Sequence, residues 1–179
     1  MKGTRMIDRQ PSAGATHQDL VITRDFAAPR ELVFKAFTEA ERLMQWWGPK
    51  ELTMHSATVD LRPGGVFHFS MRGPDGAELW GKFVYREITP PERLVFTNSF
   101  SDAQGNTVRA PWSATWPLEI LNTLTLTEHE GKTTLTLRGG PINATPTELE
   151  EFAAMAASMH EGFGGTFDKL DDYLASTAA

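Results

Sequence analysis

The sequence predicts an α+β fold in which a curved antiparallel β-sheet of about seven strands wraps around one long C-terminal helix. Three observations support this fold class. One strand-like segment near the start of the chain is followed by two short helical segments. Between residues 53 and 138, apolar and polar residues alternate with the period of a half-buried strand. Residues 146–174 instead have the three- and four-residue apolar spacing of an amphipathic helix.

The first elements are predicted from alternation and from helix-start signals. Residues 19–27 alternate as a half-buried strand. A proline then suits the first position of a short helix over 29–37, because its missing N–H would be unpaired there. Thr38 and Glu41 have the spacing of a capping box, which predicts a second short helix that ends at 46–49, Trp-Trp-Gly-Pro.

Turns rich in proline, glycine and aspartate divide the alternating region into further strands. The predicted strands are 53–61, 66–72, 79–88, 94–101, 117–127 and 133–138. Phe67, Phe69 and Met71 alternate strictly, so one face of the sheet is apolar. Two phases compete within 79–88, and we favour the one that turns Phe83 and Tyr85 inward.

The C-terminal segment is predicted to be a single helix from Pro146 to Leu174, about 40 Å long at 1.5 Å per residue. Thr145 and Glu148 form a second Thr-x-x-Glu capping box at its start. Three glycines at 162, 164 and 165 lie mid-helix, where glycine is unfavourable. They indicate either tight packing or a bend, or else room for a ligand beneath the helix.

Composition limits the classes of function. With 179 residues and 40% hydrophobic content, the chain fits one domain, predicted over 19–175, preceded by a flexible tail over 1–18. The net charge of −6 and the lack of a Lys/Arg run argue against nucleic acid or membrane as a partner. There is no cysteine, and no apolar run approaches the roughly 20 residues of a membrane span. We expect a cytoplasmic monomer or homodimer.

Several stretches resemble one known superfamily. They are Arg24-Asp-Phe-Ala-Ala-Pro-Arg-Glu-Leu-Val-Phe34, Trp46-Trp-Gly-Pro49, Asp60-Leu-Arg-Pro-Gly-Gly65, Gly73-Pro-Asp-Gly76, Pro90-Pro-Glu-Arg-Leu-Val95, and Gly162-Phe163 followed by Leu170. With the element order, they resemble the SRPBCC (START/Bet v 1-like) superfamily, and within it the activator of Hsp90 ATPase homologue 1-like (AHSA1-like) family. The resemblance implies a helix-grip fold with a cavity between sheet and long helix that takes an apolar small molecule.

The candidate cavity residues are large apolar side chains predicted to face the helix, with a few polar ones among them. They are Trp46, His55, Phe67, Phe69, Phe83, Tyr85, Phe96, Trp112, Met155, Met159, His160 and Phe163. Concentrated aromatic rings suit a flat or apolar ligand, although they can equally fill a solid core. His55 is in phase with inward-facing residues of its strand, and His160 lies at the edge of the helix's apolar face. The five histidines lack metal-ligand spacing, so we expect neither a metal nor a cofactor.

Three functions remain open at this point. We rank first the binding of an apolar or aromatic small molecule in this cavity. A polyketide-cyclase-like or hydrolytic enzyme would use His55, His160, Tyr85 or Arg109 as acid–base groups in the same cavity. The third is an interaction module of the Hsp90-activator kind. The long connection 102–116, which carries Arg109 and two tryptophans, is either a binding loop or lid, or a packing or interface segment.

Overall fold

Residues 19–177, which the computed structural model describes, form eight strands and four helices. The predicted tail over 1–18 lies outside the described residues. The strands are β1 Leu20–Phe26, β2 Thr53–Val59, β3 Val66–Arg72, β4 Glu78–Thr89, β5 Arg93–Ser101, β6 Thr107–Val108, β7 Ile120–His129 and β8 Lys132–Pro141. The helices are α1 Arg30–Thr38, α2 Ala40–Trp46, α3 Pro146–Ala154 and α4 Ala156–Thr177. Of the strands, only the two-residue β6 was not predicted.

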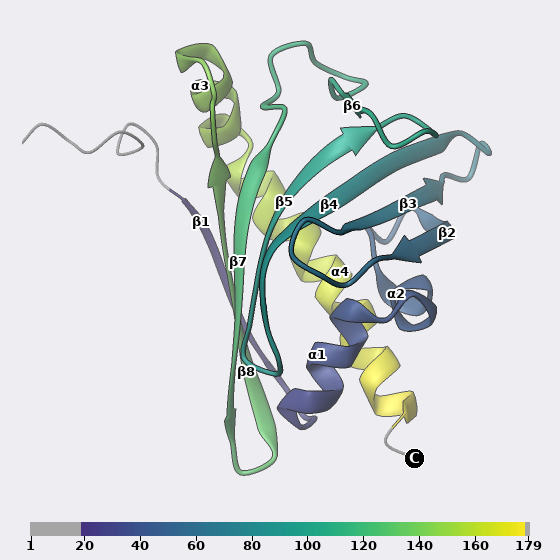
Figure 1. Cartoon of the computed structure of the whole chain (residues 1–179), viewed down its shortest axis with the longest axis vertical. Helices are drawn as coiled ribbons and strands as arrows, with labels where there is room; N and C mark the ends of the chain where they lie inside the picture. The colour runs from purple at the N-terminus through teal and green to yellow at the C-terminus, as the bar shows by residue number, and fades with distance from the viewer. Residues whose placement is uncertain (1–18, 178–179) are drawn as a thin grey trace, which may run out of the picture.

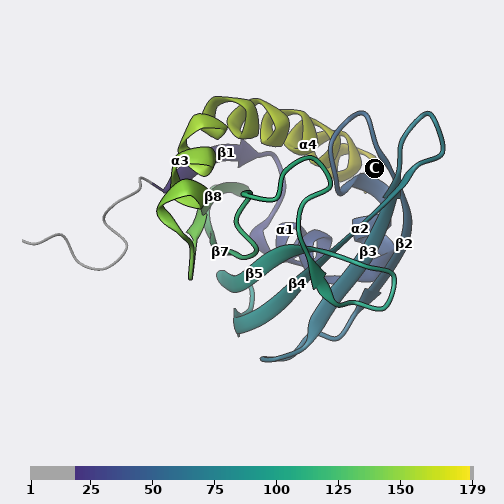
Figure 2. The same cartoon turned by 90° about the horizontal axis from the view of Figure 1, so that it is seen from above.

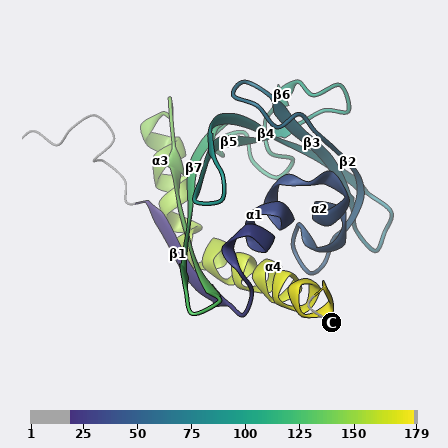
Figure 3. The same ribbon diagram turned by 60° about the horizontal axis from the view of Figure 1, so that its bottom comes forward.

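All the strands belong to one curved antiparallel sheet, with the order β1-β8-β7-β5-β4-β3-β2 and β6 paired to β5 (Figure 1). Neighbours along the chain are mostly neighbours in the sheet, as expected of a meander. The exception is β1, which pairs with β8 at the far end of the sequence. Helices α1, α2 and α4 lie on the concave side of the sheet, which confirms the predicted α+β helix-grip fold (Figure 3).

The two short helices are confirmed, but the start of the second differs from the prediction. The predicted capping box is wrong, because Thr38 is the last residue of α1 and its hydroxyl donates to the Phe34 carbonyl at 2.9 Å. Helix α2 has Glu39 as its N-cap, without a side-chain capping bond. At its end, Trp46 is fully buried and its Nε1 donates to the Ala36 carbonyl at 3.0 Å, which ties the two helices together.

The single C-terminal helix predicted from Pro146 to Leu174 is in fact two helices. The capping box of Thr145 and Glu148 is confirmed at the start of α3. The helix is interrupted at Met155, and α4 continues at a bend from α3 (Figure 2). The Met155 carbonyl still accepts from the Met159 N–H at 2.9 Å, so the interruption is brief. Apolar spacing continues across so short a break, which explains why periodicity missed it.

Only the second half of α4 packs into the core. Phe167 is fully buried and meets Phe26 and Phe37 edge-on, at centroid distances of 6.0 and 6.4 Å. Every buried residue of α4 lies at Thr166 or later, whereas Met159 in the first half is only half-buried. The first half of the helix therefore lies over the sheet without closing against it.

An ion-pair cluster joins β1 to α4. The Arg24 guanidinium donates to Asp168 at 2.7 Å, to Asp171, and to the Gly164 carbonyl at 3.1 Å. These contacts hold the first strand against the last helix beside the half that packs into the core.

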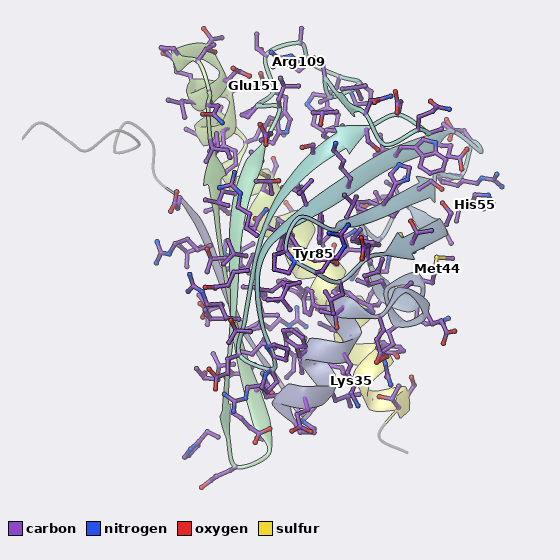
Figure 4. All side chains as sticks on the ribbon, viewed as in Figure 1. Lys35, Met44, His55, Tyr85, Arg109 and Glu151 are labelled. Atoms are coloured by element: carbon purple, nitrogen blue, oxygen red, sulfur yellow. The ribbon has the colours of Figure 1, made fainter. Side chains whose placement is uncertain are left out.

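The inward phase favoured for β4 is confirmed, since Phe83 and Tyr85 are only 2% and 1% exposed. Figure 4 shows Tyr85 in the middle of the molecule. Its hydroxyl is the one buried side-chain polar atom among residues 19–177 without a hydrogen-bond partner. Burial raises the pKa of the Tyr85 phenol well above its usual range.

We expect Tyr85→Phe to leave the protein as stable as the wild type or up to about 2 kcal/mol more stable, because it removes a buried hydroxyl that has no partner. Chemical denaturation of the two proteins measures the difference. A clear loss of stability would mean that the hydroxyl has a partner, such as a bound water. Tyr85→Leu is the control, because it also removes the ring and should destabilise.

Candidate functional site

Two adjoining cavities lie between the sheet and the first half of α4. Their volumes are about 290 Å³ and about 430 Å³. Both are bounded by the same seven residues where they meet, namely Pro49, Asn98, Phe100, Trp116, Ile120, Met159 and Phe163. This is the part of α4 that contributes no fully buried side chain, so the space follows directly from the loose packing of the helix.

The first cavity lies over the centre of the sheet, and Gly162 is the one glycine of α4 that lines it. Gly81 on its floor is needed, because a Cβ there would lie 2.7 Å from the Phe69 ring. Gly162 at its edge is different, since a Cβ there would meet nothing within 4 Å. Gly164 also has free space around it, and neither residue is therefore explained by tight packing.

The second cavity is closed at one end by the connection between β5 and β7. Trp116 packs on Phe152 of α3 with ring centroids 5.8 Å apart, and Trp112 meets Phe100 edge-on at 5.0 Å. Trp116 is buried, whereas Trp112 is 57% exposed. The connection therefore lines the second cavity and also packs on α3.

Polar contacts fasten this connection to α3. Arg109 Nη1 donates to Glu148 Oε2 at 2.7 Å and to the Trp116 carbonyl at 3.1 Å. The hydroxyls of Ser113 and Thr115 donate to Glu151 Oε2 at 2.9 and 2.6 Å. Figure 4 shows Arg109 and Glu151 at the same end of the molecule.

Glu148 is buried, and its pKa lies below its usual range because the Thr145 backbone N–H donates to it and Arg109 pairs with it. A lowered folded-state pKa means that the ionised group contributes its full stabilisation above the unfolded-state value of about 4.3. That contribution is lost as the pH falls through the lower folded-state pKa.

Glu148→Gln keeps an oxygen that can cap the helix but removes the charge. We expect it to cost about 1 kcal/mol at neutral pH and to weaken the loss of stability on acidification. Melting temperatures of both proteins, measured from pH 7 to pH 2, provide the test. If the melting temperatures of the two proteins fall in parallel as the pH is lowered, Glu148 is not responsible for the loss of stability in acid.

The lining of both cavities is uncharged. Within the described residues, its polar side chains are Asn98, Ser99, Asn122, Ser158 and Thr166, beside the indole N–H groups of Trp47, Trp80, Trp112 and Trp116. Over the same part of the chain, it contains no Asp, Glu, Lys, Arg, His or Tyr. Asn122 Nδ2 donates to Asn98 Oδ1 at 2.9 Å and to the Ile120 carbonyl at 3.3 Å. Sequence reasoning missed this amide pair. The signal was available, because Asn98 follows Leu94 and Phe96 in the same inward phase.

The structure divides the predicted cavity residues into three groups. Those that line the cavities are Phe69, Trp112, Met155, Met159 and Phe163. Those that face inward but lie in the packed core are Trp46, Phe67, Phe83, Tyr85 and Phe96. The remaining two, His55 and His160, are exposed.

The inward orientation predicted for His55 is wrong because the pairing of β2 with β3 shifts between Met54 and Ser56. This bulge turns His55 outward, where it is 45% exposed and 3.9 Å from Glu78 (Figure 4). His160 lies on the exposed side of α4 rather than at the edge of its buried face. Arg109 belongs to the contact with α3 rather than to either lining.

No group of three or more acidic or histidine side chains within residues 19–177 is arranged to hold a metal ion. Over the same residues, no helix combines the length and apolar character that crossing a membrane requires.

Comparison with known proteins places the fold. The sequence profile of the family described as Activator of Hsp90 ATPase homolog 1-like protein matches residues 27–175. A search of curated proteins gives no match. Two solved structures are similar over most of both chains. A Nitrosomonas europaea protein is 27% identical with a TM-score of 0.71, covering 89% of this chain and 96% of that one. A Mycobacterium smegmatis protein is 30% identical with a TM-score of 0.69, covering 89% and 91%.

A third solved structure, the AHSA1 protein from Silicibacter pomeroyi, is 23% identical with a TM-score of 0.66. The alignment covers 89% of this chain and 99% of that one, and at this identity the likeness concerns the fold alone.

Proposed function

The chain belongs to the Activator of Hsp90 ATPase homolog 1-like family, within the SRPBCC superfamily, and on this basis we propose that it binds an apolar small molecule between its sheet and α4. The observation that carries this proposal is the uncharged, aromatic-lined space beneath the first half of the helix. Ligand sites are typically concave and mostly apolar, with few polar groups. The adjoining spaces of about 290 Å³ and about 430 Å³ are each in the range of sites that hold a small molecule.

Gly162 of α4 supports the same proposal. Gly162 has open space where a side chain would project, and it borders the first cavity. Glycine within a helix costs about 1 kcal/mol relative to alanine. That cost has no compensation in packing here, and access for a ligand would account for it.

The enzyme alternative has less support. General acid–base catalysis requires a titratable group within reach of the bound molecule. The cavity linings, as far as residues 19–177 form them, include no such side chain, and His55, His160, Tyr85 and Arg109 all lie elsewhere. An interaction module acting on an Hsp90-type ATPase would bind its partner through the outer surface. The cavity linings neither support nor oppose that function.

An environment-sensitive apolar dye tests the proposal. We expect the wild-type protein to bind the dye and to melt at a higher temperature with it, since a ligand at 100 times its Kd adds about 2.7 kcal/mol. Gly162→Leu should block binding by filling the edge of the cavity. Gly164→Leu is the matched control, because it makes the same change on the same helix at a residue that lines neither apolar cavity. If the dye raises the melting temperature of neither the wild-type protein nor the Gly164→Leu control, the cavity does not bind apolar molecules.

A further inference from the structure

The orientation of the Asn98–Asn122 pair is fixed by its neighbours. The Ile120 carbonyl can only accept a hydrogen bond, so the Asn122 atom 3.3 Å from it must be the Nδ2 donor. The same Nδ2 lies 2.9 Å from Asn98, and its partner there must therefore be the Asn98 oxygen. This leaves the Asn98 Nδ2 group as a donor with no partner among residues 19–177.

The open ends of the two amides are accessible rather than sealed in the core. Tyr85 Oη is the only fully enclosed side-chain polar atom without a partner in the described chain, so Asn98 Nδ2 and Asn122 Oδ1 both retain accessible surface. Asn122 lines the second cavity and Asn98 lines both. A glycine opposite makes room for the pair, because a Cβ at Gly139 would lie 2.5 Å from Asn122 Oδ1.

The chemistry of the lining discriminates among ligands. A bound carboxylate would lose its hydration without meeting a positive charge, since no Lys or Arg lines either cavity. A pure hydrocarbon would displace water from the Asn98 amide and leave its donor unpaired. A neutral group with an acceptor oxygen avoids both costs, as sites built to hydrogen-bond a ligand group reject analogues that lack it.

We propose that the cavity selects uncharged apolar molecules carrying a carbonyl or carboxamide group, whose oxygen accepts a hydrogen bond from Asn98 Nδ2. A carboxamide also offers an N–H to Asn122 Oδ1 and so complements both open ends of the pair. This inference rests on the proposed function and adds to it the chemical class of the ligand.

Three probes of similar size and shape test the inference, namely 2-naphthamide, 2-isopropylnaphthalene and 2-naphthoate. Calorimetric titration of the full-length protein at pH 7.5 gives the dissociation constants. We expect the amide to bind about tenfold more tightly than the hydrocarbon, and the carboxylate to bind most weakly. Equal binding of amide and hydrocarbon, or a preference for the carboxylate, overturns the inference and leaves the proposed function standing. No binding by any probe, together with no dye binding, overturns both.

Substitutions locate the preference. Asn98→Leu removes the donor at similar size but keeps Asn122 Oδ1, so the advantage of the amide over the hydrocarbon should fall from about tenfold to about threefold or less. Asn98→Ala serves the same purpose if leucine does not fit. Ser158→Ala is the matched control, because it removes another polar group from the second cavity and should keep the preference. If the preference for the amide stays at about tenfold in both Asn98 variants, or disappears in the Ser158 variant, Asn98 is not its main source.

Discussion

Phe167→Ala is expected to destabilise the protein by about 3–5 kcal/mol, the usual cost of removing a fully buried phenylalanine. Its ring is 0% exposed and lies edge-on against Phe26 and Phe37, so it joins α4 to β1 and α1 at once. Its neighbours belong to the same buried cluster, so we expect a cavity to remain after the substitution. Urea denaturation followed by circular dichroism measures the change.

Phe163→Ala is the matched control one turn earlier on the same helix. Phe163 is only half-buried and lines both cavities, so it has fewer packed neighbours to lose. We expect it to cost less than half as much as Phe167→Ala and to weaken dye binding instead. Equal losses of stability would contradict the division of α4 into a packed half and a half over the cavity.

Gly65→Ala is expected to cost about 3 kcal/mol or more, because overpacking against backbone cannot be relieved by a rotamer change. A Cβ at this buried glycine would lie 2.0 Å from the Asp60 carbonyl oxygen. The turn is also held to β4, since the Tyr85 N–H donates to the Gly65 carbonyl at 3.0 Å. Thermal denaturation measures the effect.

Gly64→Ala separates steric clash from backbone strain at the same turn. Gly64 has φ of +83°, a region unfavourable for alanine, but a Cβ there would meet nothing within 4 Å. It should therefore cost only about 1–2 kcal/mol. If Gly64→Ala is the more damaging change, the close approach of Asp60 to Gly65 is not what makes glycine necessary.

The fold could be predicted because its determinants are local. Alternation identified every strand except the two-residue β6. The capping box of Thr145 and Glu148 identified the start of α3. The misses have equally local causes. Hydrophobic spacing does not register a one-residue break such as Met155, and the spacing of Thr38 and Glu41 does not reveal that Thr38 ends the preceding helix.

The site was less predictable because it depends on how elements meet. Inward phase identified Phe69, Met159 and Phe163, yet the same phase is shared by Phe67 and Phe83, which lie in the solid core. What distinguishes them is how closely the helices cover each part of the sheet, since only the second half of α4 contributes buried side chains. No single segment encodes that difference. His55 shows the complementary failure, since one bulge reverses the direction of its side chain.

The pairing of β1 with β8, and its ion pairs with α4, have a consequence for the order of folding. Arg24 lies 144 residues from Asp168, and Leu20 pairs with Gly139, so the first strand has no partner until most of the chain exists. Contacts between such distant residues form slowly because a long loop must close first. During synthesis, the meander from β2 to β5 can pair as it emerges. The apolar side of β1 instead stays uncovered until β8 and α4 have been synthesised. We expect the nascent chain to depend most on chaperones during this interval.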